Sequence, residues 1–208
     1  KHDLQHVHII ETSNSENISK EFLKINPIGT VPVLLHRGFP IYESHEQIKY
    51  IESQNNNTLS KSDTVDFWLK RGSLVGEPNS NYQIYAGNCV AILTTPLFVS
   101  MIKKIPLYKF FKYYLKHPSK FRAINFILFK LLGYSVFKNS SPLYKLALLS
   151  LKMIRVHLSD LNAHLKDRIW IDGDNFSLAD ITWMALLHRL EEVQLIDILC
   201  SENNNLKA

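Results

Sequence analysis

The first 52 residues change their hydrophobic period within short distances, which is typical of a mixed α/β unit. Alternating apolar positions indicate strands, and spacings of three and four residues indicate amphipathic helices. In order, the pattern predicts a strand over 4–10, a helix over 18–24, a buried strand over 31–35, a turn at Arg37-Gly38, a second strand at 41–42 and a helix from Ser44. Ser44 is expected to be the N-cap of that helix.

After this α/β unit the pattern is helical throughout. The polar stretch over 53–62 contains three consecutive asparagines and is typical of a linker. The clearest helix is predicted over 143–166, where leucine, isoleucine and alanine recur on one face. Ser177-Leu178-Ala179-Asp180 fits a capping box, so we interpret Ser177 and Asp180 as structural. The predicted domains are an α/β domain over 1–53 and an all-helical domain over 63–208.

Charge is distributed unevenly along the chain. The 208 residues include 24 Lys and Arg against 19 Asp and Glu, for a net charge of +5. From Pro78 to Ser159 there are twelve Lys and Arg and no acidic residue, so the rest of the chain holds every acidic side chain. The centre of the sequence is therefore its basic part.

The basic and aromatic stretch from Lys103 to Lys138 has three interpretations. It forms amphipathic helices with solvated lysines and an aromatic core, or a hydrophobic substrate pocket rimmed by positive charge, or an attachment to an anionic membrane surface. Nucleic acid is not expected as a partner, since no recognised nucleic-acid-binding motif accompanies the charge.

A content of 46% hydrophobic residues indicates a globular protein with a sizeable core and excludes a disordered tail or a fibre. The most apolar stretch, Cys89 to Ile102, is shorter than the ~20 residues of a spanning helix and contains polar residues, so no transmembrane helix is expected. Cys89 and Cys200 are too few for a disulfide framework, and neither they nor the nine histidines have metal-ligand spacing. We expect no metal and a reducing, cytoplasmic setting.

Two short motifs carry the candidate chemistry. In Val31-Pro32, the proline cannot donate to a sheet, and a cis bond would turn the Val31 amide and carbonyl outward to pair with an extended peptide. Glu43-Ser44 enters a helix N-terminus, where free amides and the Ser hydroxyl favour a carboxylate and Glu43 is available to an ammonium. Together the two motifs suit an amino-acid-like peptide end.

A resemblance to a known family rests on three segments, FLKINPIGTVPVL over 22–34, Ile41-Tyr42-Glu43-Ser44, and Phe176 to Asp180. The first two resemble the thioredoxin-like N-terminal domain of cytosolic glutathione transferases, and the third is similar to the capping box of that family's all-helical C-terminal domain. The resemblance implies a glutathione site in which Val31 pairs with the cysteinyl part ahead of a cis Pro32, while Glu43 and Ser44 hold the γ-glutamyl end. Thr30 stands near the glycyl end, where relatives commonly place a longer Lys or Gln.

The activity implied by the resemblance is attack of the glutathione thiolate on a hydrophobic electrophile. Alternatives are glutathione-dependent dehalogenation, ether cleavage or isomerisation, and a non-catalytic protein of the same fold at an acidic membrane surface. In the family, the Ser, Tyr or Cys that stabilises the thiolate follows a first strand that would precede Lys1, so the catalytic residue is expected outside this sequence. The helical domain is likewise expected to continue past Ala208.

The second substrate would be bound by the helical domain. Tyr82, Tyr85 and Cys89 are candidates to line the electrophile pocket, although Cys89 also suits a small core position. The family resemblance also implies a two-fold homodimer.

Overall fold

A computed structural model describes residues 10–11, 16–54, 59–74, 82–116, 120–139, 141–201 and 204–206. The strand predicted over 4–10 lies outside these residues except for Ile10. Contacts between residues divide the chain into two compact units, Lys1–Thr58 with Val99–Gly133 and Leu59–Phe98 with Tyr134–Ala208. The first unit thus includes part of the basic stretch, which the sequence assigned to the helical domain. The division predicted at residues 53 and 63 stays a prediction.

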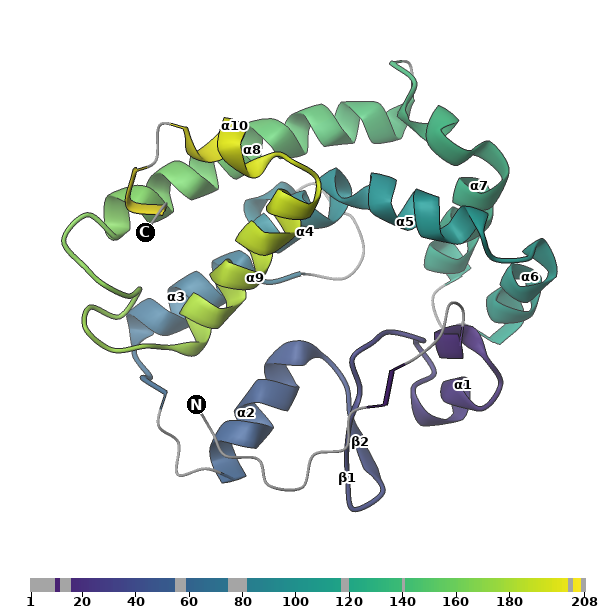
Figure 1. Ribbon diagram of the computed structural model, residues 1–208, viewed down its shortest axis with the longest axis horizontal. Helices are drawn as coiled ribbons and strands as arrows, with labels where there is room; N and C mark the ends of the chain where they lie inside the picture. The colour runs from purple at the N-terminus through teal and green to yellow at the C-terminus, as the bar shows by residue number, and fades with distance from the viewer. Residues whose placement is uncertain are drawn as a thin grey trace. The chain divides into compact units, whose positions relative to one another are not determined.

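The first unit has a small antiparallel sheet beside helices (Figure 1). Its elements are η1 (Glu16–Ile18), α1 (Phe22–Ile25), β1 (Leu34–His36), β2 (Phe39–Ile41), α2 (Ser44–Gln54), α6 (Leu107–Lys116) and α7 (Lys120–Leu132). Helix α5 (Thr95–Lys103) runs from the second unit into the first.

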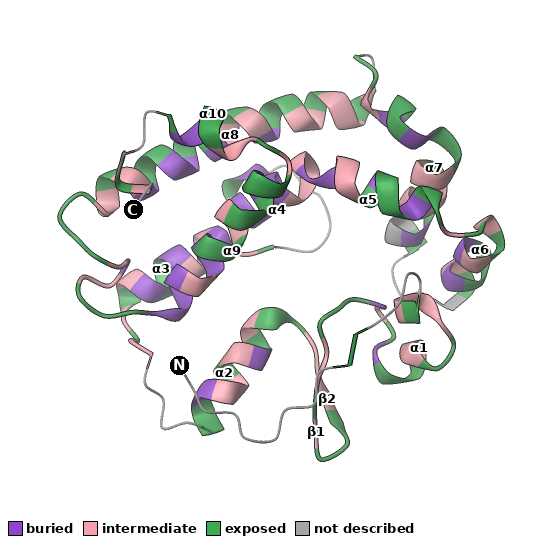
Figure 2. Cartoon of the chain, viewed as in Figure 1, coloured by how far each residue is buried: buried purple, intermediate pink, exposed green. Residues whose placement is uncertain are grey.

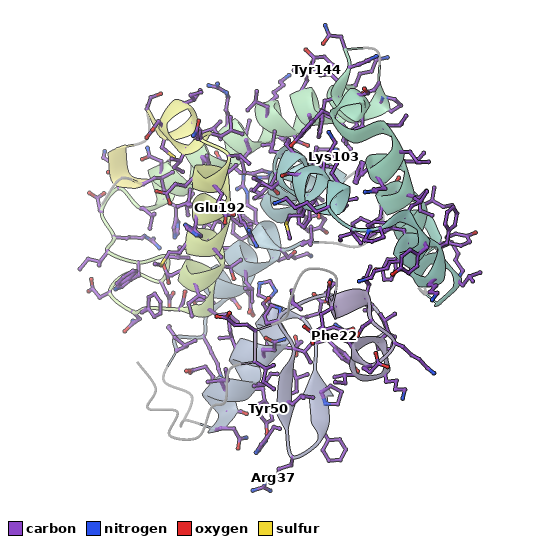
Figure 3. All side chains as sticks on the ribbon, turned by 45° about the vertical axis from the view of Figure 1, so that its right-hand side comes forward. Phe22, Arg37, Tyr50, Lys103, Tyr144 and Glu192 are labelled. Atoms are coloured by element: carbon purple, nitrogen blue, oxygen red, sulfur yellow. The ribbon has the colours of Figure 1, made fainter. Side chains whose placement is uncertain are left out.

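The strands β1 and β2 form a tight hairpin, with Leu34 opposite Ile41 and His36 opposite Phe39. Its turn is Arg37-Gly38, as predicted, and both residues have positive φ, 50° and 83°, which suits the right-handed twist of a two-residue hairpin. Figure 3 shows the Arg37 side chain pointing away from the tip. The prediction that the strand begins at residue 31 is wrong, because Pro32 has no N–H to give to a ladder.

The helix predicted over 18–24 is interrupted in the structure. The segment forms the short η1 and α1 instead, and the hydroxyl of Ser19 between them accepts a hydrogen bond from the Phe22 amide at 3.1 Å. A serine side chain that bonds to nearby backbone competes with the continuous helix, which explains the break.

The second unit is almost entirely helical, in agreement with the predicted fold class. Its elements are α3 (Asp63–Gly72), η2 (Tyr82–Ile84), α4 (Ala86–Leu93), η3 (Gly133–Phe137), α8 (Pro142–His164), α9 (Leu178–Glu192), α10 (Ile196–Cys200) and η4 (Asn204–Leu206). The long α8 confirms the helix predicted over 143–166. Figure 2 shows buried positions on α3, α4, α8 and α9, where Trp68, Cys89, Leu158 and Trp183 belong to one core.

The predicted capping box is present at the start of α9. The Ser177 hydroxyl accepts from the Asp180 amide, and the Asp180 carboxylate accepts from the Ser177 amide at 2.8 Å. The other carboxylate oxygen of Asp180 accepts from the Ile171 amide at 2.8 Å. Both Ser177 and Asp180 are buried, so their side chains are occupied by the fold, as the sequence indicated.

Within the described parts of the chain, no single helix is long and apolar enough to cross a membrane. Helices α4 and α5 together meet the length and composition of a span but are bent by 43° at their junction. The first five residues of α4 are buried, as in the core helix of a folded protein.

Candidate functional site

The loop that precedes Val31 is organised by one buried side chain, Asn26. Its amide nitrogen donates to the Thr30 carbonyl at 2.8 Å and to the Thr30 hydroxyl at 3.0 Å. Its amide oxygen accepts from the Ile28 N–H at 3.1 Å. Because Asn26 is fully buried and satisfied on both sides, it holds the loop in one shape. Asn26 thus also orients the hydroxyl of Thr30, one of the predicted ligand contacts, by donating a hydrogen bond to its oxygen.

The middle of the same loop is held from two other elements of the first unit. Asn17 donates to the Gly29 carbonyl at 2.7 Å, and the Tyr113 hydroxyl of α6 donates to the Ile28 carbonyl at 2.9 Å. Gly29 has φ +72°, and a Cβ there would lie 3.0 Å from the Asn17 carbonyl oxygen. Glycine suits this position best, since both the positive φ and the tight approach of the Asn17 carbonyl disfavour a side chain.

The Val31-Pro32 bond is cis, as the sequence suggested. Val31 is 53% exposed. Within the described part of the chain, no hydrogen bond engages the Val31 amide or carbonyl. These backbone groups are therefore available to a ligand that pairs like a strand.

The start of α2 differs from the prediction by one residue. The Glu43 carbonyl accepts the first helical hydrogen bond, from the Gln47 amide at 3.1 Å, so Glu43 rather than Ser44 stands at the N-cap position. Glu43 has φ 57°, a left-handed conformation that a glutamate rarely adopts and that costs of order 1–3 kcal/mol. The turn leaves Glu43 and Ser44 exposed at the N-terminal, positive end of the helix dipole.

A side chain that the sequence reasoning missed, Gln47, joins the two motifs. It is only 7% exposed, and its amide nitrogen donates to the Pro32 carbonyl at 2.8 Å and to the Ile41 carbonyl at 3.0 Å. One side chain of α2 thus bridges the Val31-Pro32 segment and the strand that leads into Glu43-Ser44. The structure brings these four predicted residues to one place in the first unit.

Other contacts fix the same helix and hairpin. Tyr50 of α2 hydrogen-bonds His36 of β1, and Figure 3 shows Tyr50 on α2 beside the hairpin. The Tyr42 hydroxyl donates to the Ile25 carbonyl at 2.6 Å. Burial lowers the pKa of His45, and the nearby Lys49 lowers it further, so His45 is mainly neutral near pH 7 and adds little positive charge to the helix N-terminus.

The candidates for the electrophile pocket lie in the second unit. Tyr85 precedes α4 and is half-buried, and Tyr82 begins η2. Cys89 is fully buried in the core, where burial raises the pKa of its thiol to about 12. The structure thus places Cys89 at a small core position, the other interpretation that the sequence left open, and a buried thiol does not line a cleft.

The segment between these tyrosines is anchored through the Gln83 carbonyl. His157 Nε2 donates to it at 3.0 Å, because the Arg71 guanidinium donates to His157 Nδ1 at 3.0 Å and so fixes the neutral tautomer. The Cys89 thiol also lies 3.5 Å from this carbonyl. Burial lowers the pKa of His157, which agrees with a neutral ring. Arg71 in turn pairs with Asp160.

Among the described residues, no three His, Cys, Asp or Glu side chains gather in a way that would hold a metal ion. What the first unit does present is a set of exposed backbone groups at Val31, a carboxylate at Glu43 and a hydroxyl at the helix N-terminus at Ser44. Such a set can bind the backbone, ammonium and carboxylate of a small peptide.

Known proteins resemble this chain in its fold and in the segment that holds these residues. A family model described as the glutathione S-transferase N-terminal domain matches residues 2–54, which include Val31, Pro32, Glu43 and Ser44. The chain is 42% identical over 55 residues to a tetrachloro-p-hydroquinone reductive dehalogenase of Sphingobium chlorophenolicum, covering 26% of this chain and 22% of that relative. It is 39% identical over 69 residues to a probable elongation factor 1-gamma 2 of Arabidopsis thaliana, covering 30% and 17%. The matches therefore span about a fifth of these relatives.

Solved structures extend the likeness beyond the N-terminal segment. The β-etherase LigF of Sphingobium sp. strain SYK-6 matches with a TM-score of 0.69 at 20% identity, covering 93% of this chain and 77% of that one. A glutathione transferase of Burkholderia graminis, with two glutathione molecules bound per subunit, matches with a TM-score of 0.51 at 16% identity, covering 92% and 65%. Residues 2–54 therefore match the glutathione S-transferase N-terminal domain model, and the chain has the glutathione transferase fold.

Proposed function

We propose that this protein binds glutathione in its first unit and directs the glutathione thiolate at a hydrophobic electrophile. The observation that carries the proposal is the Gln47 bridge, which holds the cis Val31-Pro32 segment against the hairpin and the start of α2. These residues lie in the segment that the glutathione S-transferase N-terminal model matches. The solved glutathione transferase with bound glutathione supports the choice of ligand.

Each group has a separate task in this proposal. The Val31 amide and carbonyl pair with the cysteinyl residue, which aims the sulfur. Ser44 and the N-terminus of α2 bind the γ-glutamyl carboxylate, and Glu43 receives its ammonium. Thr30 lies nearest the glycyl end, where its hydroxyl accepts from Asn26 and keeps its own O–H as a donor for the glycyl carboxylate.

The thiolate is the nucleophile, because a thiol of ordinary pKa is largely protonated at neutral pH. None of the residues placed in this site has the position of the thiolate-stabilising Ser, Tyr or Cys. The proposed chemistry of this chain is therefore binding and orientation of glutathione, and the activating residue is left unassigned.

The names of the relatives guide the choice of electrophile. One is a reductive dehalogenase and one a β-etherase, so halogenated aromatics and aryl ethers are the classes to screen first, with isomerisation as a further alternative. The relative named as an elongation factor supports the other alternative, a glutathione transferase fold without turnover. We further propose a homodimer, which sedimentation would test. A cytoplasmic setting is also proposed, on the ground that neither Cys89 nor Cys200 is in a disulfide.

Calorimetric titration of glutathione into the full 208-residue chain tests the binding step. We expect saturable binding in the micromolar to millimolar range, about −8 to −4 kcal/mol. Ser44→Ala should weaken it by about 1–3 kcal/mol through loss of a charge-assisted hydrogen bond. The matched control is Ser53→Ala, at an exposed position near the end of the same helix, whose hydroxyl donates to the Tyr50 carbonyl and accepts from the Gln54 side chain.

Two results would contradict the proposal. One is the absence of glutathione binding to the folded wild-type chain by two independent methods. The other is an unchanged dissociation constant in folded Ser44→Ala, which would remove Ser44 from the site while leaving the fold in place.

A further inference from the structure

Helix α6 of the first unit is apolar on two sides. Phe110 and Tyr113 are buried and form its inner face. Tyr108, Phe111 and Leu115, spaced three and four residues apart on another face, are 58%, 52% and 74% exposed. An ordinary surface helix would carry polar residues at those positions.

Helix α7, which packs against α6, repeats the arrangement. Ala123 is fully buried, while Ile124, Leu128 and Leu131 recur at helical spacing and are all exposed. Exposed positions of both helices are green in Figure 2. Single exposed apolar residues are common, but two adjacent helices that each expose a regular apolar stripe mark an interaction surface.

The charge along this segment of the sequence has one sign. Residues 99–133 contain eight Lys and Arg and no acidic residue. Lys112 stands between Phe111 and Leu115 on α6 and is exposed, with its ammonium 5.5 Å from the Tyr108 ring centroid. Lys104, just before α6, is exposed as well. The surface that this segment presents therefore favours an anionic partner.

We propose that α6 and α7 dock the protein on an anionic lipid bilayer, in the plane of its headgroups. Aromatic and aliphatic side chains interleaved with lysines are the composition of interfacial helices, since the apolar groups enter the acyl boundary while the ammonium groups reach the phosphates. A protein partner with a matching groove would need acidic residues opposite each lysine, whereas an anionic bilayer meets every such charge without a fixed register. The docking is peripheral and reversible.

Vesicle flotation tests the proposal with the 208-residue chain. The protein is mixed with vesicles of phosphatidylcholine alone or with about 30% phosphatidylserine, at low and at high NaCl. We expect binding to the anionic vesicles at low salt, little binding to neutral ones, and a clear loss of binding at high salt because exposed charges are screened.

Substitutions in α6 separate the two contributions. Phe111→Ser with Leu115→Ser should weaken vesicle binding at least about tenfold, because two large side chains no longer enter the bilayer. The matched control is Ile169→Ser with Met184→Ser, two exposed apolar positions of the second unit. Lys112→Glu should weaken binding at least about fivefold, whereas Lys166→Glu, an exposed lysine outside the basic stretch, should change it little.

Each outcome of this experiment has one meaning. Absence of binding to anionic vesicles at low salt overturns the proposal, and so does equal binding to neutral vesicles. If the wild type ignores vesicles but forms a dimer that Phe111→Ser with Leu115→Ser dissociates, the face is an interface between copies and not a membrane surface. Ser44→Ala should bind vesicles like the wild type, so failure of the glutathione proposal and failure of the membrane proposal are distinguishable.

Discussion

Replacing Gln47 by leucine would test whether one buried amide positions the proposed glutathione site. Leucine fills most of the same volume but donates no hydrogen bond, so the Pro32 and Ile41 carbonyls lose their common donor. Because the shape of the side chain changes little, the substitution separates the effect of the two hydrogen bonds from the effect of packing around α2.

The expected magnitude follows from the two hydrogen bonds. Each contributes about 1 kcal/mol net, so the variant should lose roughly 1–3 kcal/mol of unfolding free energy. The Val31-Pro32 segment would then adopt the binding-competent conformation in a smaller fraction of molecules. The apparent affinity for glutathione falls in proportion to that fraction. Loss of about 2 kcal/mol sets an upper limit of about 30-fold on the rise in dissociation constant.

Gln47→Glu provides a second, pH-dependent test. At neutral pH a buried carboxylate would face two carbonyl oxygens, so glutathione binding should be weaker than in Gln47→Leu. Burial raises the pKa of such a carboxyl, and acidification restores an O–H donor. Binding by Gln47→Glu relative to wild type should therefore improve as the pH is lowered.

The assay is titration calorimetry with glutathione, with thermal unfolding measured in parallel. Gln54→Leu serves as the control, because Gln54 is exposed at the end of the same helix and its side chain donates to the Ser53 hydroxyl. A Gln47→Leu variant that is folded and binds glutathione within twofold of wild type would refute the positioning role.

Two further predictions concern the second unit. Asp180→Ala should lower the unfolding free energy by about 3 kcal/mol in a denaturant titration, because three hydrogen-bond donors lose a buried acceptor. The affinity for glutathione should stay unchanged. A variant as stable as the wild type would show that the cap contributes little. Burial holds the pKa of His157 in the folded protein below its usual 6.5, so on acidification the unfolded chain binds this proton at a higher pH than the folded protein does. The unfolding free energy should therefore fall as the pH drops below about 6.5, by at most ~1.4 kcal/mol per pH unit. His157→Gln should flatten that dependence, whereas His188→Gln, at an exposed position, should not; an unchanged slope in His157→Gln would assign the effect to other groups.

Features that depend on a few neighbouring residues could be predicted from the sequence. The Arg37-Gly38 turn, the long α8 and the capping box of Ser177 and Asp180 are all present. Their determinants are local, since a turn, an amphipathic period and a helix cap each need only groups within a few positions. The motif around Val31-Pro32 and Glu43-Ser44 was recognisable for the same reason.

Local competition explains the predictions that were wrong. A serine hydroxyl interrupts the helix expected over 18–24, and Glu43 takes the N-cap position expected of Ser44. In both cases the residue types allow the helix to begin at more than one position. A difference in the backbone conformation of one residue decides which position is used.

Only the tertiary structure shows what holds the site together. Gln47 stands among helical positions of α2 and is indistinguishable in the sequence from a solvated glutamine, yet it is buried and reaches Pro32, fifteen residues away. Tyr113 reaches Ile28 across 85 residues. The exposed apolar stripes of α6 and α7 have the same spacing as a buried face, so the sequence predicts that each helix has apolar faces but not which are covered. Burial depends on contacts between distant segments, and those exist only once the chain has folded.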